Sequence, residues 1–401
     1  MERVVLAYTG GLDTSVCIHW LKNVKGLRVV TFEADLGQGQ YLEPISERAL
    51  ATGAEVAHTE DLRDTFAREY IFPALRANAE YESGNPLGQA LSRPLIASAV
   101  VKKALDEGCR FVAHGCTPKG NDQARFEASI AALAPQLKII APQREWHLKT
   151  RQDELEYARK HSLPVRITKD SPYNIDRNLW CTSIIGYATL EDPWQEPPKD
   201  VFLTTCAPED CPDKPTTVTI AFERGDPVSV DGKALSPVNL IELLNQMGGG
   251  NGVGRLDAME NRLMGLKSRA IYEAPAATVL HMAHRALEDM TLSRDVSHFK
   301  ARLSQRYAEL VYDGLWFGDL RRALDAFFLE TQKYVTGEVR LKLYKGSCMV
   351  LGRRSPFSQY RRELVTYGPD DTFNRASAQG FLDVWSLPLR SEALQKRKGR
   401  A

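Results

Sequence analysis

The chain has 401 residues, which is long for a single hydrophobic core, so we expect two domains. Its hydrophobic fraction of 43% and charged fraction of 26% are typical of globular proteins, and a formal net charge of +1 argues against a nucleic-acid or membrane-surface partner. No apolar run is long enough for a signal-peptide core or a transmembrane helix, and 7 scattered cysteines do not suggest a disulfide framework, so we expect a cytoplasmic protein.

The first part of the chain alternates short apolar strands with helices. Strands are predicted over residues 4–7, 27–32, 111–113 and 138–140, and helices over residues 14–22, 45–51, 95–105 and 126–133. This alternation is typical of an α/β domain with a doubly wound parallel sheet, in which ligands bind at the carboxyl ends of the strands. We assign residues 1–165 to this nucleotide-binding domain.

The pattern changes near residues 164–172, which are followed by a Pro- and Asp-rich connector over 191–213. Strands are predicted over residues 216–222, 228–230 and 338–344, and helices over 278–289 and 320–331. Residues 166–370 are therefore predicted to form a second, α+β synthetase domain. A helix over 388–396, with proline in its first turn, and a basic tail make up a C-terminal segment, 371–401, which we expect to contact another subunit.

A glycine-rich loop stands between the first strand and the first helix, where residues 8–15 read YTGGLDTS. The paired glycines allow a sharp turn that brings backbone N–H groups close to a phosphate, and the helix N-terminus adds partial positive charge. The hydroxyls of Thr9, Thr14 and Ser15 add further donors. The loop is not a Walker A motif. It matches the S/T-G-G-x-D-S/T-S pattern of enzymes that cleave ATP between its α- and β-phosphates.

Further blocks follow this loop along nearly the whole chain. In the first domain they are ADLGQ at 34–38, DLR at 61–63, IFPAL at 71–75, RPLIA at 93–97, HG at 114–115, KGNDQ at 119–123 and LAPQ at 133–136. The second domain adds LEDP at 190–193, ENR at 260–262, KSR at 267–269 and RLKLYKG at 340–346. In these blocks and their order the chain resembles the argininosuccinate synthase family.

The resemblance implies an ATP-dependent ligase that forms C–N bonds. Members of the family use Mg-ATP to activate the ureido oxygen of citrulline as an adenylate, with release of pyrophosphate, and the amine of aspartate then displaces AMP. Positioning and charge stabilisation are the main demands of such nucleotidyl transfer, and a glycine-rich loop with Mg²⁺ can supply them. The resemblance also implies a homotetramer, small-molecule substrates and a role in arginine biosynthesis.

Site residues carry over from the family position by position. The nucleotide set is Ala7, Tyr8, Thr9, Gly10, Gly11, Leu12, Asp13, Thr14, Ser15, Ala34 and Gly115. The aspartate set is Thr117, Asn121 and Asp122, in which the carboxylate would pair with an ammonium group. The acceptor set is Asn85, Ala90, Asn121, Arg125, Asn174, Ser183, Glu260 and Tyr272. We expect Asp13 and Asp122 to be catalytic, and no residue is assigned as a metal ligand.

The acceptor set departs from the family pattern, whereas the nucleotide and aspartate sets do not. Where the family has Tyr-x-Leu-Gly-Thr-Ser, residues 85–90 read NPLGQA. Asn174 replaces a serine, and Ile185 stands where a Ser-x-Glu pattern places its glutamate. Changed polar contacts can mean a changed substrate, since an unpaired polar group in a site is costly. The alternatives are a citrulline-specific ligase with compensated changes and a paralogue that joins aspartate to another ureido or carboxamide acceptor.

Other motifs and other functions have weaker support. The glycine cluster at 248–254 follows a helical segment and is interpreted as a turn, and His281 and His284 lack an evident third metal ligand. Cys206 and Cys211 lie in the connector and do not form a C-x-x-C pair. A tRNA-modifying enzyme with the same loop would have a basic surface and often a catalytic cysteine pair. A regulatory homologue without turnover is disfavoured by the intact Asp13 and Asp122.

Overall fold

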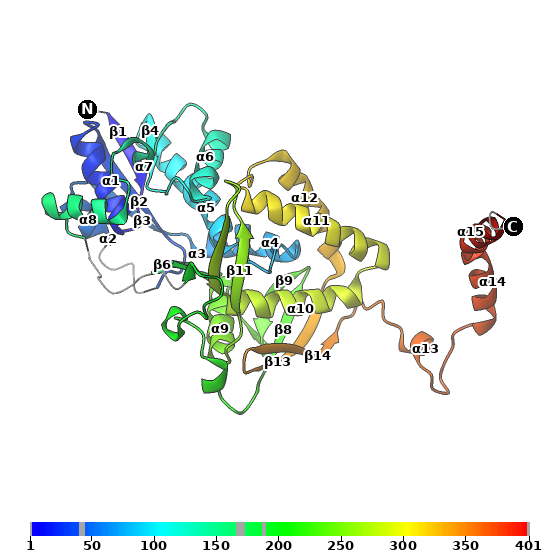
Figure 1. The fold of residues 1–401 in the computed structure, drawn as a ribbon. Helices are drawn as coiled ribbons and strands as arrows, with labels where there is room; N and C mark the ends of the chain where they lie inside the picture. The colour runs from blue at the N-terminus through cyan, green and yellow to red at the C-terminus, as the bar shows by residue number, and fades with distance from the viewer. Residues whose placement is uncertain (1, 40–44, 166–172, 187–189, 399–401) are drawn as a thin grey trace. The chain divides into compact units, whose positions relative to one another are not determined.

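The structure is a computed structural model that describes residues 2–39, 45–165, 173–186 and 190–398 (Figure 1). The chain divides into two compact units, Met1–Phe357 and Ser358–Ala401. Residues 166–172, where we place the boundary between the first two domains, lie outside the described residues, as do Gly399 and Arg400 of the basic tail.

The first half of the larger unit is built on a parallel sheet. Its strands are β1 (Arg3–Ala7), β2 (Arg28–Asp35), β3 (Val56–Asp61), β4 (Phe111–His114) and β5 (Lys138–Ile140), in the order β3-β2-β1-β4-β5. In this sheet, β2 and β3 lie on one side of β1, and the later strands β4 and β5 lie on the other. The carboxyl ends of β1 and β4 therefore flank the point where the strand order reverses, which is where open parallel sheets bind ligands.

Helices cover both faces of this sheet, as the alternation of buried residues along β1 requires. Val4 and Leu6 belong to one apolar cluster with residues of α1 (Leu12–Asn23), whereas Val5 and Ala7 belong to a second cluster with residues of α5 (Gly88–Asp106). The other helices of this half are α2 (Ile45–Thr52), α3 (Arg63–Thr65), α4 (Phe72–Arg76), α6 (Asp122–Leu133), α7 (Pro142–Glu145) and α8 (Arg151–Lys160). The predicted doubly wound sheet is confirmed.

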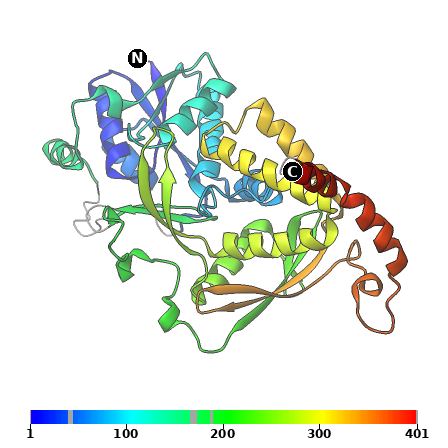
Figure 2. The ribbon, with the colours of Figure 1, turned by 45° about the vertical axis from the view of Figure 1, so that its right-hand side comes forward.

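The second half of the larger unit contains two antiparallel sheets. One has the order β10-β9-β8-β13-β14, with β8 (Thr216–Glu223), β9 (Asp226–Val230), β10 (Lys233–Ala234), β13 (Gly337–Tyr344) and β14 (Ser347–Arg354). The other has the order β11-β12-β7-β6, with β6 (Tyr173–Arg177), β7 (Thr182–Gly186), β11 (Arg255–Asn261) and β12 (Lys267–Glu273). The helices are α9 (Pro237–Gly250), α10 (Pro275–Thr291), α11 (Arg294–Tyr312) and α12 (Asp319–Thr331), and α10 packs across β13 and β14 (Figure 2).

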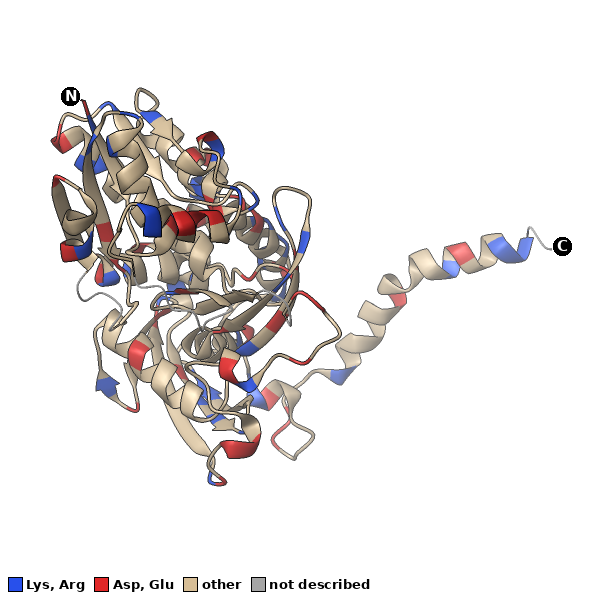
Figure 3. Ribbon diagram, turned by 60° about the vertical axis from the view of Figure 1, so that its left-hand side comes forward, with Lys and Arg blue, Asp and Glu red and all other residues tan. Residues whose placement is uncertain are grey.

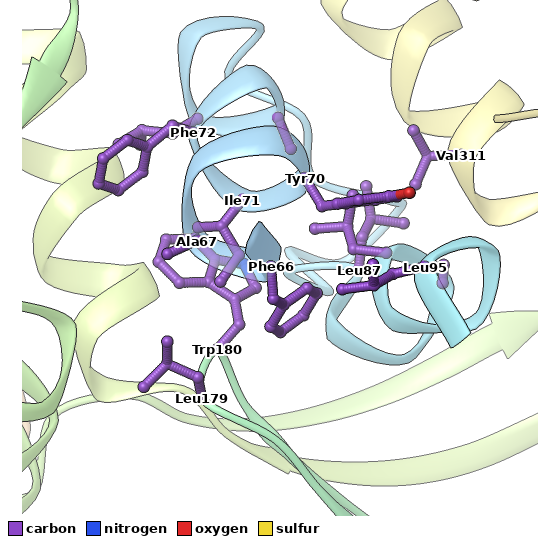
Figure 4. Packing of buried hydrophobic residues seen from close by; sticks show 14 of the residues in the cluster. Phe66, Ala67, Tyr70, Ile71, Phe72, Leu87, Leu95, Leu179, Trp180 and Val311 are labelled. Carbon is purple, nitrogen blue, oxygen red and sulfur yellow. The ribbon is translucent and has the colours of Figure 1, made fainter. Parts of the chain in front are cut away.

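The two halves share a hydrophobic core. A π-helical turn, Phe66–Ile71, leads into α4 and buries Phe66 and Ile71 completely. Figure 4 shows these side chains with Leu95 of α5 and Trp180 of the β6–β7 turn, and Val311 of α11 belongs to the same cluster, where it lies near Tyr70. Because one cluster draws on elements of both halves, residues up to Phe357 fold as one unit.

The smaller unit consists of α13 (Arg362–Val365), α14 (Arg375–Trp385) and α15 (Leu387–Lys398). The predicted helix over 388–396 corresponds to α15, whereas α14 was not predicted. Apolar side chains of α14 are exposed, with Phe381 at 61% and Trp385 at 65% relative exposure. Such exposed apolar area on a helix is typical of a surface that another chain covers.

Charge is spread evenly over the described chain. Lysine and arginine residues are interspersed with aspartate and glutamate residues in both units, apart from the basic last turn of α15 (Figure 3). Within the described part of the chain, every helix is too short or too polar to cross a membrane.

Candidate active site

The glycine-rich loop forms a tight turn between β1 and α1. Gly10 has φ +73°, and a Cβ atom at this position would lie 2.9 Å from Cγ1 of Ile45, so the turn requires glycine. Nη1 of Arg48 donates to the carbonyl oxygen of Gly10 at 2.6 Å. Gly11 is the N-cap residue of α1, which no side chain of the described residues caps. The first N–H groups of α1 are thus free to bind an anion.

The hydroxyl groups of the loop fall into two pairs. Ser15 is fully buried, and its Oγ lies 3.1 Å from the hydroxyl oxygen of Tyr8. The Oγ1 atoms of Thr9 and Thr14 lie 3.1 Å apart, and Thr9 is exposed. The first pair supports the loop from inside, whereas the second pair is the one that a bound phosphate can reach.

The two predicted nucleotide residues outside the loop lie on the strands beside it. Ala34 lies in β2, and Gly115 directly follows β4, the other neighbour of β1. A Cβ atom on Gly115 would lie 2.9 Å from Cγ2 of Thr14, so residue 115 packs directly against the loop. The nucleotide set therefore converges at the reversal point of the sheet.

Asp13 in the first turn of α1 has a carboxylate neighbour, Glu154 of α8. Burial and the interaction with Asp13 raise the pKa of Glu154 to about 9. Oε2 of Glu154 is buried, and it forms no hydrogen bond of ordinary geometry within the described chain. This pair places two carboxyl groups beside the phosphate loop. No motif in the sequence pointed to Glu154 as a site residue.

The aspartate set begins two residues after Gly115. The N–H of Gly120 donates to the carbonyl oxygen of Thr117 at 3.0 Å, and this turn leads into α6. Oδ2 of Asp122 accepts from Nε of Arg93 at 3.0 Å, and its Oδ1 accepts from Nη1 of Arg125 at 2.9 Å. Burial alone would raise the pKa of Asp122, but the two arginines lower it below its ordinary value. Asp122 is therefore held as a carboxylate.

Asn121 connects this set to a buried polar network centred on Glu260. Its Nδ2 donates to the hydroxyl oxygen of Tyr312 at 2.9 Å, and the Tyr312 hydroxyl donates to Oε2 of Glu260 at 3.0 Å. Oε1 of Glu260 accepts from the Tyr272 hydroxyl at 2.5 Å and from Nδ2 of Asn85 at 2.7 Å. Three predicted acceptor residues, Asn85, Glu260 and Tyr272, are thus bonded to one another directly, and the unpredicted Tyr312 connects Asn121 to them.

Comparison with known proteins decides the family. The model of the arginosuccinate synthase N-terminal HUP domain matches residues 3–164, and that of the arginosuccinate synthase C-terminal domain matches residues 173–392. The argininosuccinate synthase of Pelotomaculum thermopropionicum is 54% identical over 398 residues, which are 99% of each chain. The enzymes of Desulfitobacterium hafniense (50% over 398 residues, 99% of each chain) and Chlorobium phaeobacteroides (53% over 390 residues, 97% of each chain) are similarly close.

The chain belongs to the argininosuccinate synthase family. The resemblance inferred from the sequence blocks is confirmed, and the tRNA-modifying alternative has no support. The comparisons also give no support to the alternative of a paralogue that acts on another acceptor. The roles of individual site residues stay predictions.

Two of the remaining acceptor positions of this family member border the Glu260 network. Ser183 of β7 is buried and stands opposite Tyr272 in the strand pairing, whereas Asn174 of β6 is exposed and stands opposite Ile185. Nε of Arg125 donates to the carbonyl oxygen of Tyr312 at 2.9 Å. Ala90 is buried in α5. Ser183 and Arg125 therefore border the network, while Asn174 makes no hydrogen bond to it within the described residues.

Besides Glu154, three residues of the site were not assigned from the sequence. Arg93 bonds to both Asp122 and Asp176, so it links α6 to β6. The ring of Tyr81 stacks on that of Tyr312 at a centroid distance of 3.6 Å. Arg93 belongs to the RPLIA block of the family and could have been found there, whereas Tyr312 ends a helix, α11, that was not predicted.

The histidine pair of α10 is structural. Nδ1 of His284 lies 2.8 Å from Oδ1 of Asn78, and its Nε2 lies 2.8 Å from Oε1 of Gln332. Burial lowers the pKa of His281 and of His284 to about 4. The glycine cluster at 248–254 is only partly a turn, because Gly248, Gly249 and Gly250 belong to α9. Within the described residues, no cluster of three or more His, Cys, Asp or Glu side chains is arranged for a metal ion.

Proposed function

We propose that this protein is an ATP-dependent ligase that condenses citrulline with aspartate through a citrullyl-adenylate and releases AMP and pyrophosphate. One structural observation supports this proposal in addition to family membership. Gly115 packs against Thr14 of the phosphate loop, and the chain then runs within seven residues to Asn121 of the polar network and to Asp122, which follows it. A nucleotide at the loop and amino-acid substrates at the network would therefore be neighbours.

The geometry supports separate roles for the loop, which would bind the phosphates, and the network, which would bind the amino-acid substrates. The N–H groups of α1 and the hydroxyls of Thr9 and Thr14 would bind the phosphates and stabilise the charge of the departing pyrophosphate. In the first step the ureido oxygen bonds to the α-phosphorus while the bond to pyrophosphate breaks. In the second step the amine of aspartate bonds to the ureido carbon, loses a proton, and AMP leaves.

We propose Mg²⁺ as the partner of ATP, with Asp13 and Glu154 as the residues that would hold it. Mg²⁺ is commonly bound by one or two carboxylates together with substrate phosphates, and this pair offers two carboxyl groups, of which Glu154 would release its proton on binding the ion. When bound, the ion neutralises phosphate charge. The role of Asp13 and Glu154 is to fix its position relative to the first turn of α1.

We propose that Thr117, Asn121 and Asp122 bind the aspartate substrate. Arg93 and Arg125 hold the carboxylate of Asp122 in its charged form, which suits it to accept a hydrogen bond from an amino group. Asn121 bonds to Tyr312, so the aspartate and acceptor sites share this residue. An amine bound at Asp122 would thus be oriented toward an acceptor bound beside Glu260.

We also propose the domain limits 1–165, 166–370 and 371–401 and a homotetramer formed through the C-terminal segment. The gap between the two matched ranges, after residue 164 and before residue 173, supports the first boundary. The exposed apolar side chains of α14 support contact with another subunit. Free cysteines throughout the described chain support a cytoplasmic location.

The test of the proposed reaction is an omission experiment. Pyrophosphate and AMP are measured with ATP, Mg²⁺, citrulline and aspartate, and then with each component left out in turn, while mass spectrometry identifies the product. Equal amounts of pyrophosphate, AMP and argininosuccinate in the complete mixture alone would support the proposal. Pyrophosphate release without citrulline at the full rate, or a different condensed product, would overturn it.

A further inference from the structure

The acceptor network contains one carboxylate that no arginine neutralises. Asp122 and Asp176 are both paired with Arg93, whereas Glu260 forms no ion pair within the described residues. Glu260 is 5% exposed. If the proposed function holds, the acceptor carries an α-ammonium group, which requires a carboxylate partner in a buried site. Glu260 is the carboxylate in this network that has no cationic partner of its own.

The hydrogen-bonding capacity of Glu260 is largely occupied by the protein. A carboxylate offers about four lone-pair positions. Asn85 and Tyr272 occupy two on Oε1, and Tyr312 occupies one on Oε2. Burial and the neighbouring Glu260 raise the pKa of Tyr272 well above its ordinary value, so its phenol stays protonated and donates. An acceptor ammonium therefore meets a carboxylate with about one position left.

The backbone fixes the orientation of the Asn85 amide. Its Oδ1 accepts from the N–H of Leu87 at 2.8 Å, so its Nδ2 faces Glu260 and the hydroxyl of Tyr272, at 2.7 and 3.1 Å. The segment is held from both sides, because Asn85 pairs with Tyr81 through two backbone hydrogen bonds and Nε1 of Trp180 donates to the carbonyl oxygen of Pro86. Asn85 cannot turn away from Glu260 without breaking this arrangement.

We infer that Asn85 is a specificity-determining residue of the acceptor site, because its amide competes with the α-ammonium group of the acceptor for Glu260. The inference rests on the proposed function and deepens it. The site of this chain discriminates only weakly between citrulline and δ-ureidovalerate, which is citrulline without the α-amino group. Removal of the amide restores a lone-pair position on Glu260 and raises the preference for the amino acid.

The test compares the wild type with Asn85→Ser and Asn85→Ala. Serine can still accept from the N–H of Leu87 and so keeps the local turn, but it lacks the donor to Glu260. We expect the ratio of kcat/KM for citrulline to that for δ-ureidovalerate to rise about tenfold in both variants, through a lower KM for citrulline with little change in kcat. Asn23→Ala, at the exposed end of α1, is the matched control and leaves the ratio unchanged.

Direct binding of both acceptors by calorimetry makes the result independent of turnover. A citrulline preference that rises in the variants supports the inference, whether or not the chain turns over citrulline. A ratio within twofold of the wild-type value in a folded Asn85→Ser protein would overturn it. Wild-type protein that binds citrulline but yields no argininosuccinate would instead contradict the proposed function, and the binding ratio would still decide the role of Asn85.

Discussion

Arg93 of α5 donates from Nε to Oδ2 of Asp122 at 3.0 Å, and the same guanidinium is bonded to Asp176 of β6. The side chain of Arg93 is 14% exposed, so this is an interior contact between the nucleotide-binding half and the second half of the chain. Through Arg93, the stability of the site depends on the charge of Asp122, the residue that we expect to bind aspartate.

Replacement of Arg93 by alanine is expected to lower the free energy of unfolding by about 1–3 kcal/mol, because Asp122 and Asp176 lose their shared partner. Lysine at this position keeps the positive charge but lacks the several N–H donors of the guanidinium group. Arg93→Lys should therefore lower the free energy of unfolding by less than Arg93→Ala does. Denaturant unfolding measures the difference. Arg68→Ala removes an exposed pair with Asp64 and should cost less than about 0.5 kcal/mol. Equal losses in the two alanine variants would contradict this role of Arg93.

Asp13→Asn is expected to abolish pyrophosphate release and to leave the thermal midpoint nearly unchanged. The residue lies at the first turn of α1 beside Glu154, where we propose that its charge serves the phosphates and Mg²⁺ and not the packing of the helix. Asp64→Asn on α3 is the exposed control. An Asp13→Asn protein that unfolds, or that retains full turnover, would show that the proposed role is wrong.

Aspartate is expected to be required, with asparagine and glutamate as poor substitutes. The turn from Thr117 to Asp122 is short, and Arg93 and Arg125 fix the carboxylate of Asp122. Glutamate, with its longer side chain, and asparagine, with its uncharged one, are therefore expected to lose contacts with this set. Initial rates with each amine donor measure the selectivity. Equal turnover with ammonia in the absence of aspartate is the outcome that this prediction does not allow.

The ionisation of Glu33 is expected to lower the free energy of unfolding as the pH rises. Burial raises its pKa from 4.5 to about 7, so the folded chain holds a proton that the unfolded chain has released. The stabilising contribution is present below about pH 4.5 and is lost as the pH rises through about 7. Glu33→Gln should therefore raise the unfolding midpoint at pH 8 but not at pH 4.5.

The exposed substitution Glu330→Gln on α12 is the control for Glu33 and should have no such pH dependence. A Glu33→Gln midpoint shifted equally at both pH values would mean that Glu33 is charged in the folded protein throughout this range.

The sequence predicted β1, β2, β4 and β5 of the parallel sheet because these strands are short apolar runs bounded by glycine-rich or polar turns. The edge strand β3 reads VAHTED and was missed, because its residues are mostly polar or small. The loop at residues 8–15 was found because glycine, hydroxyl and carboxylate residues are adjacent in the chain. The antiparallel sheet of β6, β7, β11 and β12 was missed. Its strands carry site residues such as Glu260 and Tyr272, and polar residues on an inward face weaken the alternation that reveals a strand.

The polar network could not be derived from spacing. Asn85 and Glu260 are 175 residues apart, and their contact depends on the packing of β11 against the segment before α5. Tyr312 and Glu154 lie in helices whose patterns indicate only an amphipathic surface. Family resemblance supplied the positions of Asn85, Glu260 and Tyr272, but the hydrogen bonds that connect them, and the engagement of Glu260 by Asn85, came from the structure alone.

The central claim is that the ureido oxygen of citrulline attacks the α-phosphorus of ATP. The most direct measurement uses citrulline with a heavy-oxygen label in the ureido group and follows the label by mass spectrometry. We predict that AMP carries the label in an amount equal to the argininosuccinate formed. Unlabelled AMP together with labelled phosphate or pyrophosphate would contradict attack at the α-phosphorus and, with it, the proposed mechanism.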